Sequence, residues 1–458
     1  MPADVGAIEA WLPTWLPRQR WFGDKARAIS TCRVVAAHPI TATTALHVVR
    51  VEFLDGAPAD YVTPIVDGSY EGAAGSPAFL AELARLVCGE TSWSDAIKRI
   101  ELRESQAKLS ALRGQTLDVE QSNTSIRYGN DWVVKLSRRL SYGPSPELEL
   151  STVMNRWEGP RCAPRIAASL ELRTDVGVAP LAAQAEFIAN QGDGWSYLLG
   201  LLRAESASGE RPDDAASSMR EVEAIAELTA DMHGALSLDP WHAHVAPERI
   251  TPEIAAGWEA RLTSSLEHGL GLLRDARSML LGRSGALAEL VAGASPVIRA
   301  HTDGFRALVG STRIRVHGDY HLGQVLRTHQ GRYVAVDFDG EPQRSLKERR
   351  AKFSPLRDVA GMLGSFSYAI GTVQAEQGGS TKDAWFPMWE RTARRVFVAA
   401  YVGRLTTNGS TLLPADLEQV RQSLAALELE KAVYMIHYEL NNRPDWVWIP
   451  LSQLVRMS

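Results

Sequence analysis

The sequence has few cysteines, and it has no long apolar run. Its three cysteines, Cys32, Cys88 and Cys162, lie far apart and form no C-x-x-C pair. This spacing argues against a disulfide framework and a zinc ribbon, and it favours a reducing cytoplasm. A membrane helix needs about twenty apolar residues in a row, and no such window occurs. The N-terminus also lacks a basic start followed by an apolar stretch. We therefore expect a cytoplasmic protein that does not span a membrane.

Positive charge is also not concentrated anywhere along the chain. The net charge is −5, and no run of Lys or Arg is long enough to form a binding stripe. Nucleic acid and acidic membranes are therefore not expected as partners, since both attract clustered positive charge. Apolar residues make up 45% and charged residues 22% of the 458 residues, which predicts a chain that folds throughout. This length predicts two or three domains.

The first part of the chain is rich in predicted strands. Short alternating patterns between residues 32 and 65 predict a small antiparallel sheet, and a helix is expected near 76–87. Residues 98–136 predict a second sheet, whose last two strands are joined by a Gly-Asn-Asp turn. Segments 164–172 and 177–189 predict two more strands, and a loop with the sequence ANQGDGW follows them.

The second part of the chain is dominated by helical periodicity from about Ser196 onward. The main interruption is a predicted pair of strands within 313–340, joined by a turn at His329–Gly331. A further helix, PELELSTVMNRW, follows the second sheet. The sequence thus predicts a strand-rich first part, a short loop and a helix-rich second part.

The strongest chemical signal is VHGDYHLGQVL, followed by VAVDFDGEP. Asp319 lies in a polar loop, where an aspartate is often only a turn former. Its neighbours favour catalysis, because Asp319 can accept a hydroxyl proton while Gln324 with Asp337 or Asp339 supplies oxygen ligands for Mg²⁺ against phosphate oxygens. These residues predict phosphoryl transfer.

A phosphate site also needs a cation, and Lys135 in the predicted strand DWVVKL is suitably placed. Glu149 in the following helix could pair with it and orient it. The alternative interpretation is a lysine that protects an edge strand from aggregation. The preceding stretch, EQSNTSIRYG, offers the small polar residues Ser122, Asn123 and Thr124. These residues would either donate hydrogen bonds to phosphates or form an ordinary turn.

The two histidines beside Asp319 allow a rival hypothesis. His317 and His321 could bind zinc or iron together with Asp319, as in a metal-dependent hydrolase. The nearest other histidines have no companion ligand at a useful spacing. We therefore expect both rings to hydrogen-bond the backbone of their own loop.

HGDYHLGQ, VDFDGEP and SPLRDVAGML together resemble motifs of the aminoglycoside-phosphotransferase-like kinases, specifically their actinobacterial maltokinase-like and glucosamine kinase branch. The resemblance extends over most of the chain. In the same order occur WLPRQRWFGDKAR, EQSNTS, AEFIANQGDGW and LEKAVYMIHYELNNRPDWVWIPL.

The resemblance implies an α+β, two-lobed protein-kinase-like fold with an N-terminal cap subdomain. Residues 1–95 would form the cap, and 96–189 the small β-rich nucleotide-binding lobe with a linker at 186–190. Residues 191–458 would form the helical lobe with the catalytic loop and the acceptor site. The resemblance also implies roles for single residues. Asp319 would be the catalytic base, and Gln324 and Asp337 would bind magnesium. Lys135 would contact the nucleotide phosphates with Glu149 as its partner, and the adenine would be contacted by Glu186, Phe187 and Ile188.

Two departures from typical maltokinases concern the substrate. This chain has DFDGEP where maltokinases read DFEGEP, and its last motif ends YELNNRPDWVWIPL, which resembles the glucosamine kinases. In this stretch Glu439 and Asn442 could accept hydrogen bonds from an amino sugar, and Trp446 could stack on its ring. The alternative is that they cap and pack the final helices. Asp193 would be a further acceptor contact or a turn former.

We therefore predict an ATP- and Mg²⁺-dependent sugar kinase that converts D-glucosamine to glucosamine 6-phosphate. The alternative is a maltokinase that makes maltose 1-phosphate. An aminoglycoside phosphotransferase and a non-catalytic, sugar-binding pseudokinase are the further possibilities. We expect a monomer whose partner is a small sugar.

Overall fold

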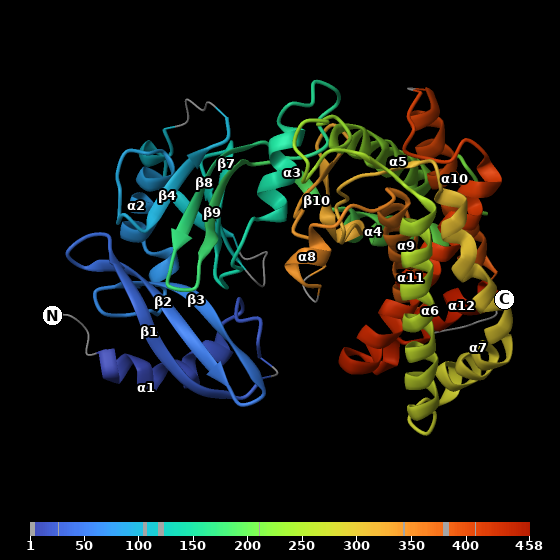
Figure 1. Ribbon diagram of the computed structural model, residues 1–458, viewed down its shortest axis with the longest axis horizontal. Coiled ribbons are helices and arrows are strands. Elements are labelled where there is room, and N and C mark those ends of the chain that lie inside the picture. The colour runs from blue at the N-terminus through green and yellow to red at the C-terminus, as the bar shows by residue number, and fades with distance from the viewer. Residues whose placement is uncertain are drawn as a thin grey trace. The chain divides into compact units, whose positions relative to one another are not determined.

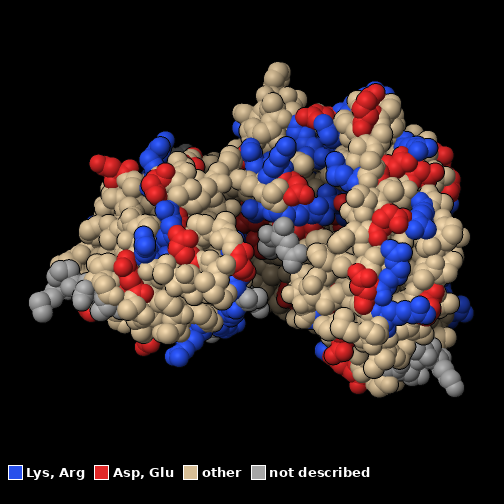
Figure 2. All heavy atoms as spheres, turned by 60° about the horizontal axis from the view of Figure 1, so that its bottom comes forward, with Lys and Arg blue, Asp and Glu red and all other residues tan. Residues whose placement is uncertain are grey.

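The structure is a computed structural model of the whole chain. It describes residues 5–25, 27–103, 108–117, 123–209, 211–341, 344–378, 384–407 and 409–458. The chain divides into two compact units, and each is described by itself. The first unit comprises Met1–Asn155 and Pro164–Ala189, and the second comprises Arg156–Ala163 and Asn190–Ser458. Figure 1 labels their helices and strands, and Figure 2 shows how charged side chains are distributed over one face.

The first unit contains two sheets with short helices (Figure 1). Its elements, in chain order, are α1 (Val5–Trp15), η1 (Leu16–Arg18), β1 (Ile29–Pro39), β2 (Thr44–Phe53), β3 (Gly56–Val66), η2 (Ala73–Gly75), α2 (Pro77–Val87), β4 (Ile97–Glu101), η3 (Leu109–Ala111), β5 (Gly114–Leu117), β6 (Asn123–Tyr128), β7 (Trp132–Ser137), α3 (Pro146–Met154), β8 (Ile166–Arg173) and β9 (Val178–Glu186).

The first sheet is the predicted antiparallel one, with strand order β1-β2-β3. The helix that follows it, α2, begins where Ser76 accepts a hydrogen bond from the backbone N–H of Phe79 and Pro77 occupies the first helical position. The apolar face of α2, including Phe79 and Leu83, is fully buried. The predicted sheet and helix are therefore confirmed.

The second sheet is six-stranded, with the order β4-β8-β9-β7-β6-β5. It shares a hydrophobic core with the first sheet, because Val48 and Val62 of the first pack with Val134 and Leu170 of the second around α2. Backbone bonds also connect the two, since the N–H of Val62 donates to the carbonyl of Arg138 at 2.7 Å. The predicted three-part division of the chain stays a prediction, and in this structure the cap and the small lobe are one compact unit.

The second unit is mainly helical. Its elements are β10 (Asn190–Asp193), α4 (Gly194–Ser208), α5 (Ser217–Leu236), β11 (Glu248–Arg249), α6 (Pro252–Asp275), α7 (Gly282–Ala300), η4 (His301–Leu308), β12 (Thr312–Arg313), η5 (Leu322–Gln324), β13 (Val325–Thr328), β14 (Tyr333–Ala335), α8 (Leu346–Arg349), α9 (Leu356–Glu376), α10 (Trp385–Thr407), α11 (Leu417–Asn442), η6 (Pro444–Trp446) and α12 (Trp448–Arg456). Among the described residues, no helix is both long and apolar enough to cross a membrane.

A small antiparallel sheet with the order β10-β13-β14 carries the segment that holds Asp319 and Asp337. The predicted strand pair corresponds to β13 and β14, with the turn between them. The expected loop ANQGDGW is different, because its residues Asn190–Asp193 form β10 on β13 and Gly194 begins α4. Helices α9 and α11 pack against each other, and α6 packs on α11.

Candidate active site

Lys135 lies on β7, an interior strand between β9 and β6. Its interior position contradicts the alternative of an edge-strand lysine. The Nζ atom is 3.8 Å from Oε2 of Glu147, and both side chains are mostly buried. Glu147 and Glu149 both lie in the first turn of α3, which Ser145 caps by accepting the N–H of Leu148. The ion pair described here is with Glu147, and the predicted pairing with Glu149 stays a prediction.

The other predicted nucleotide contacts of the first unit surround the ends of β7. Asn123 and Thr124 begin β6, and they pair in register with Ser137 and Leu136. Ser122 lies outside the described residues. Glu186 ends β9, and its carboxylate accepts the backbone N–H of Arg165 at 3.3 Å.

Phe187 and Ile188 follow β9 directly. The backbone N–H of Phe187 donates to the carbonyl of Asp131 at 2.7 Å, and the guanidinium of Arg127 lies 4.3 Å from the centre of the Phe187 ring. Ile188 is buried. The end of β9 is thereby fixed to the turn that begins the Lys135 strand.

In the second unit, the loop of Asp319 is held by a buried aspartate that the sequence motifs did not single out. Asp358, near the start of α9, is 1% exposed. Its two carboxylate oxygens accept the backbone N–H groups of His317 at 2.8 Å and Gly318 at 3.0 Å. Asp319 is half-buried and follows directly. The backbone before the candidate base is therefore fixed by a charge-assisted clamp.

Asp358 is itself held in place by hydrogen bonds to side chains of the core. The Nε2 atom of buried His233 lies 3.1 Å from Oδ2 of Asp358, and its Nδ1 atom lies 2.8 Å from the hydroxyl of Tyr401. Burial alone would raise the pKa of Asp358, but the hydrogen bonds from His233 and the Gly318 backbone and the charges nearby lower it. Asp358 thus remains an anion despite its burial. The available signal was LRDVAGM, where a lone acid sits in an apolar helical pattern.

The two histidines beside Asp319 hydrogen-bond their own loop, as predicted. His317 contacts the carbonyl of Val336 through Nε2 at 2.9 Å, and its Nδ1 accepts the N–H of Asp319 at 3.4 Å. Nδ1 of His321 accepts the N–H of Gly323 at 3.1 Å, and burial lowers the pKa of His321. Over the described ranges, no three His, Cys, Asp or Glu side chains gather as a metal site. The hydrolase hypothesis has no support.

Gln324 and Asp337 are brought together by the strand pair. Gln324 directly precedes β13 and Asp337 follows β14, and the backbone N–H of Val336 donates to the carbonyl of Gln324 at 2.9 Å. The amide Nε2 of Gln324 lies 3.4 Å from Oδ2 of Asp337. Asp337 has a φ of 66°, a left-handed conformation that few residues other than Gly adopt. Asp339 lies two residues further, and its carbonyl accepts a hydrogen bond from Arg349 at 3.0 Å.

This donor set fits Mg²⁺. Magnesium takes hard oxygen ligands, and it is usually held by one or two carboxylates together with substrate phosphates and water. The side chains of Gln324 and Asp337 meet at 3.4 Å through the amide nitrogen, so the amide group and the carboxylate lie within reach of one ion.

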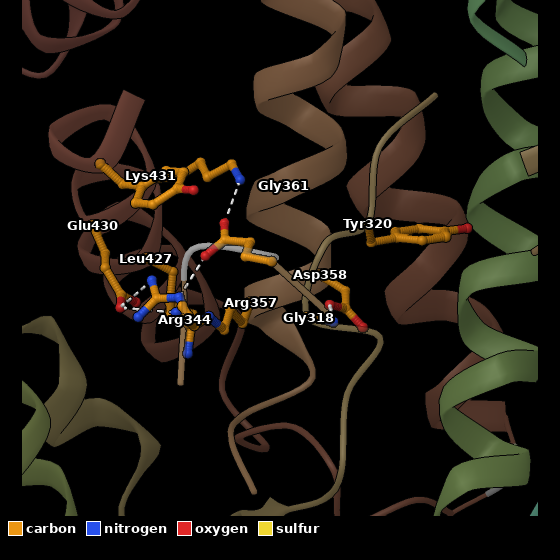
Figure 3. Close-up of a pocket in the computed structure, with 11 residues that line it drawn as sticks. Gly318, Tyr320, Arg344, Arg357, Asp358, Gly361, Leu427, Glu430 and Lys431 are labelled. Atoms are coloured by element: carbon orange, nitrogen blue, oxygen red, sulfur yellow. Dashed lines mark hydrogen bonds and ion pairs between the residues drawn. The ribbon is translucent and has the colours of Figure 1, made fainter. Parts of the chain in front are cut away.

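A small pocket beside Gly318 contains a network of ion pairs (Figure 3). Glu341 is 4% exposed, and its carboxylate accepts hydrogen bonds from Lys431 at 2.7 Å and Arg344 at 2.5 Å. Glu430 binds Arg357 at 3.2 Å and lies 3.9 Å from Arg344. Burial would raise the pKa of Glu341, but Lys431, Arg344 and Arg357 lower it to about 2. The network holds the segment after Asp339 to α11.

The predicted sugar contacts make structural interactions within the second unit. Glu439 is fully buried in α11, and its carboxylate binds Arg443 in a bidentate manner, at 2.7 and 3.0 Å, and the hydroxyl of Tyr368 at 2.8 Å. The exposed Asn442 donates to the carbonyl of Tyr438 at 2.8 Å. Trp446 is half-buried near the guanidinium of Arg443.

Asp193, the fourth predicted sugar contact, caps α4. Its carboxylate accepts the backbone N–H of Ser196 at 2.7 Å. This capping contact is a local structural role, which agrees with the alternative that Asp193 only shapes the backbone. None of these four roles in sugar binding is decided by the geometry, and each stays a prediction.

Known proteins resemble this chain in sequence. The family model described as the maltokinase N-terminal cap domain matches residues 15–98. The glucosamine kinase of Streptacidiphilus jiangxiensis is 29% identical over 364 residues, which cover 78% of this chain and 75% of that protein. The glucosamine kinase of Mycolicibacterium smegmatis is 29% identical over 354 residues, which cover 76% and 81%.

Solved structures resemble the whole fold. A glucosamine kinase crystal form has a TM-score of 0.69 at 23% identity, over 99% of this chain and 98% of that one. A glucosamine kinase in complex with glucosamine, ADP and inorganic phosphate has a TM-score of 0.69 at 24% identity, over 100% and 99%. The predicted fold class is confirmed, because the chain shares the fold of these solved structures. The predicted branch agrees with the match to the maltokinase N-terminal cap and with the two glucosamine kinase relatives.

Proposed function

We propose that this relative of the glucosamine kinases is an ATP-dependent phosphotransferase whose acceptor is a sugar hydroxyl. The favoured reaction converts D-glucosamine to glucosamine 6-phosphate. Two curated relatives carry the name glucosamine kinase, and a structural neighbour was solved with glucosamine, ADP and inorganic phosphate. These names describe the relatives. We carry glucosamine over from them to this chain as the proposed acceptor.

The observation that carries the proposal is the contact between Gln324 and Asp337 at 3.4 Å, at the ends of the strand pair that follows the Asp319 loop. Asp319 would accept the proton of the sugar hydroxyl as its oxygen attacks the γ-phosphorus of ATP in line with the leaving ADP oxygen. The clamp from Asp358 to the loop backbone keeps Asp319 in a fixed position for this step. Positioning of this kind supplies a large share of the rate acceleration in phosphoryl transfer.

Gln324 and Asp337 would hold Mg²⁺, with Asp339 as a further oxygen ligand. Bound there, the ion neutralises charge on the phosphate oxygens. Lys135 would contact the phosphates of the nucleotide, aimed by an acid of α3, and Asn123 and Thr124 would add donors beside them. Glu186, Phe187 and Ile188 would contact the adenine. All of these roles are part of the proposal.

The maltokinase alternative has one specific observation in its favour, the cap domain at residues 15–98. It differs in the acceptor and in the hydroxyl that is phosphorylated, which is O1 for maltose and O6 for glucosamine. The acceptor residues Glu439, Asn442, Trp446 and Asp193 are proposed for the amino sugar.

The deciding experiment incubates the purified chain with ATP and Mg²⁺ and offers glucosamine, glucose, maltose and an aminoglycoside in parallel. ADP release is measured, and ³¹P NMR identifies the phosphorylated hydroxyl. We expect the highest rate with glucosamine, phosphorylation at O6, and loss of activity with EDTA that added Mg²⁺ restores. Faster release with maltose would establish the alternative. No release above background with any sugar would overturn the kinase proposal.

A further inference from the structure

A wide groove of about 1340 Å³ opens on the second unit. We call it the basic groove; it is lined by α6, α8 and α11, by Arg313 and Arg344, and by residues from 243–248 and 350–357. Its lining contains seven Lys and Arg residues against three Glu residues, an excess of four positive charges with His neutral. The whole chain has a net charge of −5. The groove is therefore a local reversal of the overall charge.

The internal ion pairs of the groove do not neutralise it. Glu248 is shared by Arg313 and Lys352, each at 2.5 Å. Glu430 is likewise shared by Arg344 and Arg357. Of the two glutamates, Glu248 leaves one positive charge in excess, whereas Arg344 is also paired with Glu341 at 2.5 Å. Since phosphate groups are bound by such clustered cations, the groove is suited to an anion.

Two further cations have their charge available. Arg261 on α6 and Lys347 on α8 are exposed and line the groove. Neither makes an ion pair or a side-chain hydrogen bond with any residue that the structure describes. Ser264 and Ser265 lie one turn along α6 from Arg261 and offer hydroxyls to the same space. The groove thus combines cations for a phosphate with neutral donors for hydroxyl groups.

The groove adjoins the candidate active site. Arg344, Arg357, Glu430 and Tyr434 line both the groove and the small pocket beside Gly318, the residue before Asp319. A ligand in the groove would therefore lie next to the loop where phosphoryl transfer is proposed. Positive charge attracts the phosphate of a phosphorylated product, a group that the free sugar lacks.

We propose that the basic groove binds the phosphomonoester of a sugar, held by Arg261 and Lys347 at its phosphate. Its volume exceeds the roughly 300–1,000 Å³ of ordinary small-molecule pockets, which leaves room for a sugar phosphate with its water. The identity of the sugar rests on the proposed function, whereas binding of the phosphate class does not. The positive charge of the groove could also attract nucleic acid, so the test includes an oligonucleotide.

The test is isothermal titration of the full chain with glucosamine 6-phosphate and glucose 6-phosphate, at low and high salt. Glucose is the neutral control, and a single-stranded oligonucleotide is the competing ligand. We compare the wild type with Arg261→Glu, Lys347→Glu and the double variant. Arg391→Glu on α10 is the matched control, because Arg391 is exposed and lies outside the groove.

We expect both sugar phosphates to bind, glucose not to bind, and high salt to weaken the affinity. Each groove variant should weaken binding about tenfold or more, because a charge-assisted contact is lost. Arg391→Glu should leave the affinity unchanged. Equal affinity in wild type and double variant, or binding of the oligonucleotide without the sugar phosphates, would overturn the proposal. The kinase proposal is judged separately by ADP release, so either can fail while the other stands.

Discussion

The carboxylate of Asp358 accepts the backbone N–H of Gly318 at 3.0 Å, one residue before Asp319. Asp358 also accepts the N–H of His317, and His233 and Tyr401 continue the chain of hydrogen bonds into the core. Because the backbone N–H groups and His233 engage both carboxylate oxygens of Asp358, we assign it a positioning role. Its contacts connect the interior of the helical unit to the candidate base.

Replacement of Asp358 should therefore affect turnover and folding together. Asp358→Asn loses a buried charge that three donors depend on, so we expect the free energy of unfolding to fall by about 3 kcal/mol or more. At temperatures where the variant is folded, we expect a lower kcat at an unchanged KM for ATP. Tyr401→Phe removes only the far hydrogen bond of His233 and should cost about 1 kcal/mol. Urea unfolding and steady-state kinetics measure both, and a full kcat in folded Asp358→Asn would contradict the positioning role.

Asp319→Asn tests the catalytic base directly. We expect turnover to fall by a factor of about 100 or more, since that is the usual contribution of a general base. Nucleotide affinity, measured by titration with ADP, should be nearly intact. Asp303→Asn, an exposed carboxylate elsewhere in the second unit, is the matched control. Unchanged turnover in Asp319→Asn would remove Asp319 from the mechanism.

Lys135→Met tests the phosphate contact in the first unit. Methionine keeps most of the side-chain volume in the interior strand and removes the charge, so folding should be maintained. We expect kcat/KM for ATP to fall about tenfold or more, because a charge-assisted bond to phosphate is lost. Lys98→Met changes an exposed lysine of β4 in the same sheet and is the control. Equal kinetics in the two variants would exclude Lys135 from the nucleotide site.

Glu439→Gln tests the selection of an amino sugar. We expect KM to rise more for glucosamine than for glucose, by roughly five- to tenfold, because a charge-assisted bond becomes an ordinary one. The buried pair with Arg443 is also weakened, so the melting temperature must be measured alongside. Glu418→Gln, at the exposed start of the same helix, is the control. An equal loss for both sugars would move the specificity determinant elsewhere.

Glu341 predicts a stability change with pH. Its folded pKa of about 2 lies below the ordinary glutamate value, so its contribution is fully present above about pH 4.5 and is lost as the pH falls towards 2. The shift corresponds to about 3 kcal/mol. Unfolding at pH 7, 4 and 3 should therefore show wild type and Glu341→Gln converging in acid, whereas exposed Glu223→Gln should follow the wild type throughout. A constant gap between wild type and Glu341→Gln would refute this.

Local patterns were sufficient to predict much of the fold. Alternation and a hairpin turn predicted β6 and β7, and Ser76 with Pro77 marks the start of α2. The loop after β9 was not predicted correctly, because β10 is only four residues long and exists through pairing with β13 far along the chain. The interior position of Lys135 was equally invisible, since strand order is a long-range property.

In the candidate site, too, local patterns were predictable from the sequence and long-range contacts were not. Spacing brought Gln324 and Asp337 into one prediction because a single strand pair joins them. The role of Asp358 depends on packing between α9 and a loop 40 residues earlier. The basic groove was missed for a related reason: a search for runs of Lys and Arg cannot detect cations that come from separate segments between 261 and 357.

The left-handed backbone of Asp337 limits what natural variation can do there. Glycine, asparagine and aspartate tolerate a φ of 66°, and other residues would strain the turn. An Asn or Gly at this position keeps the fold and removes the carboxylate. If Asp337 holds Mg²⁺ as proposed, a homologue with Asn or Gly at this position would keep the turn and lose the proposed metal ligand.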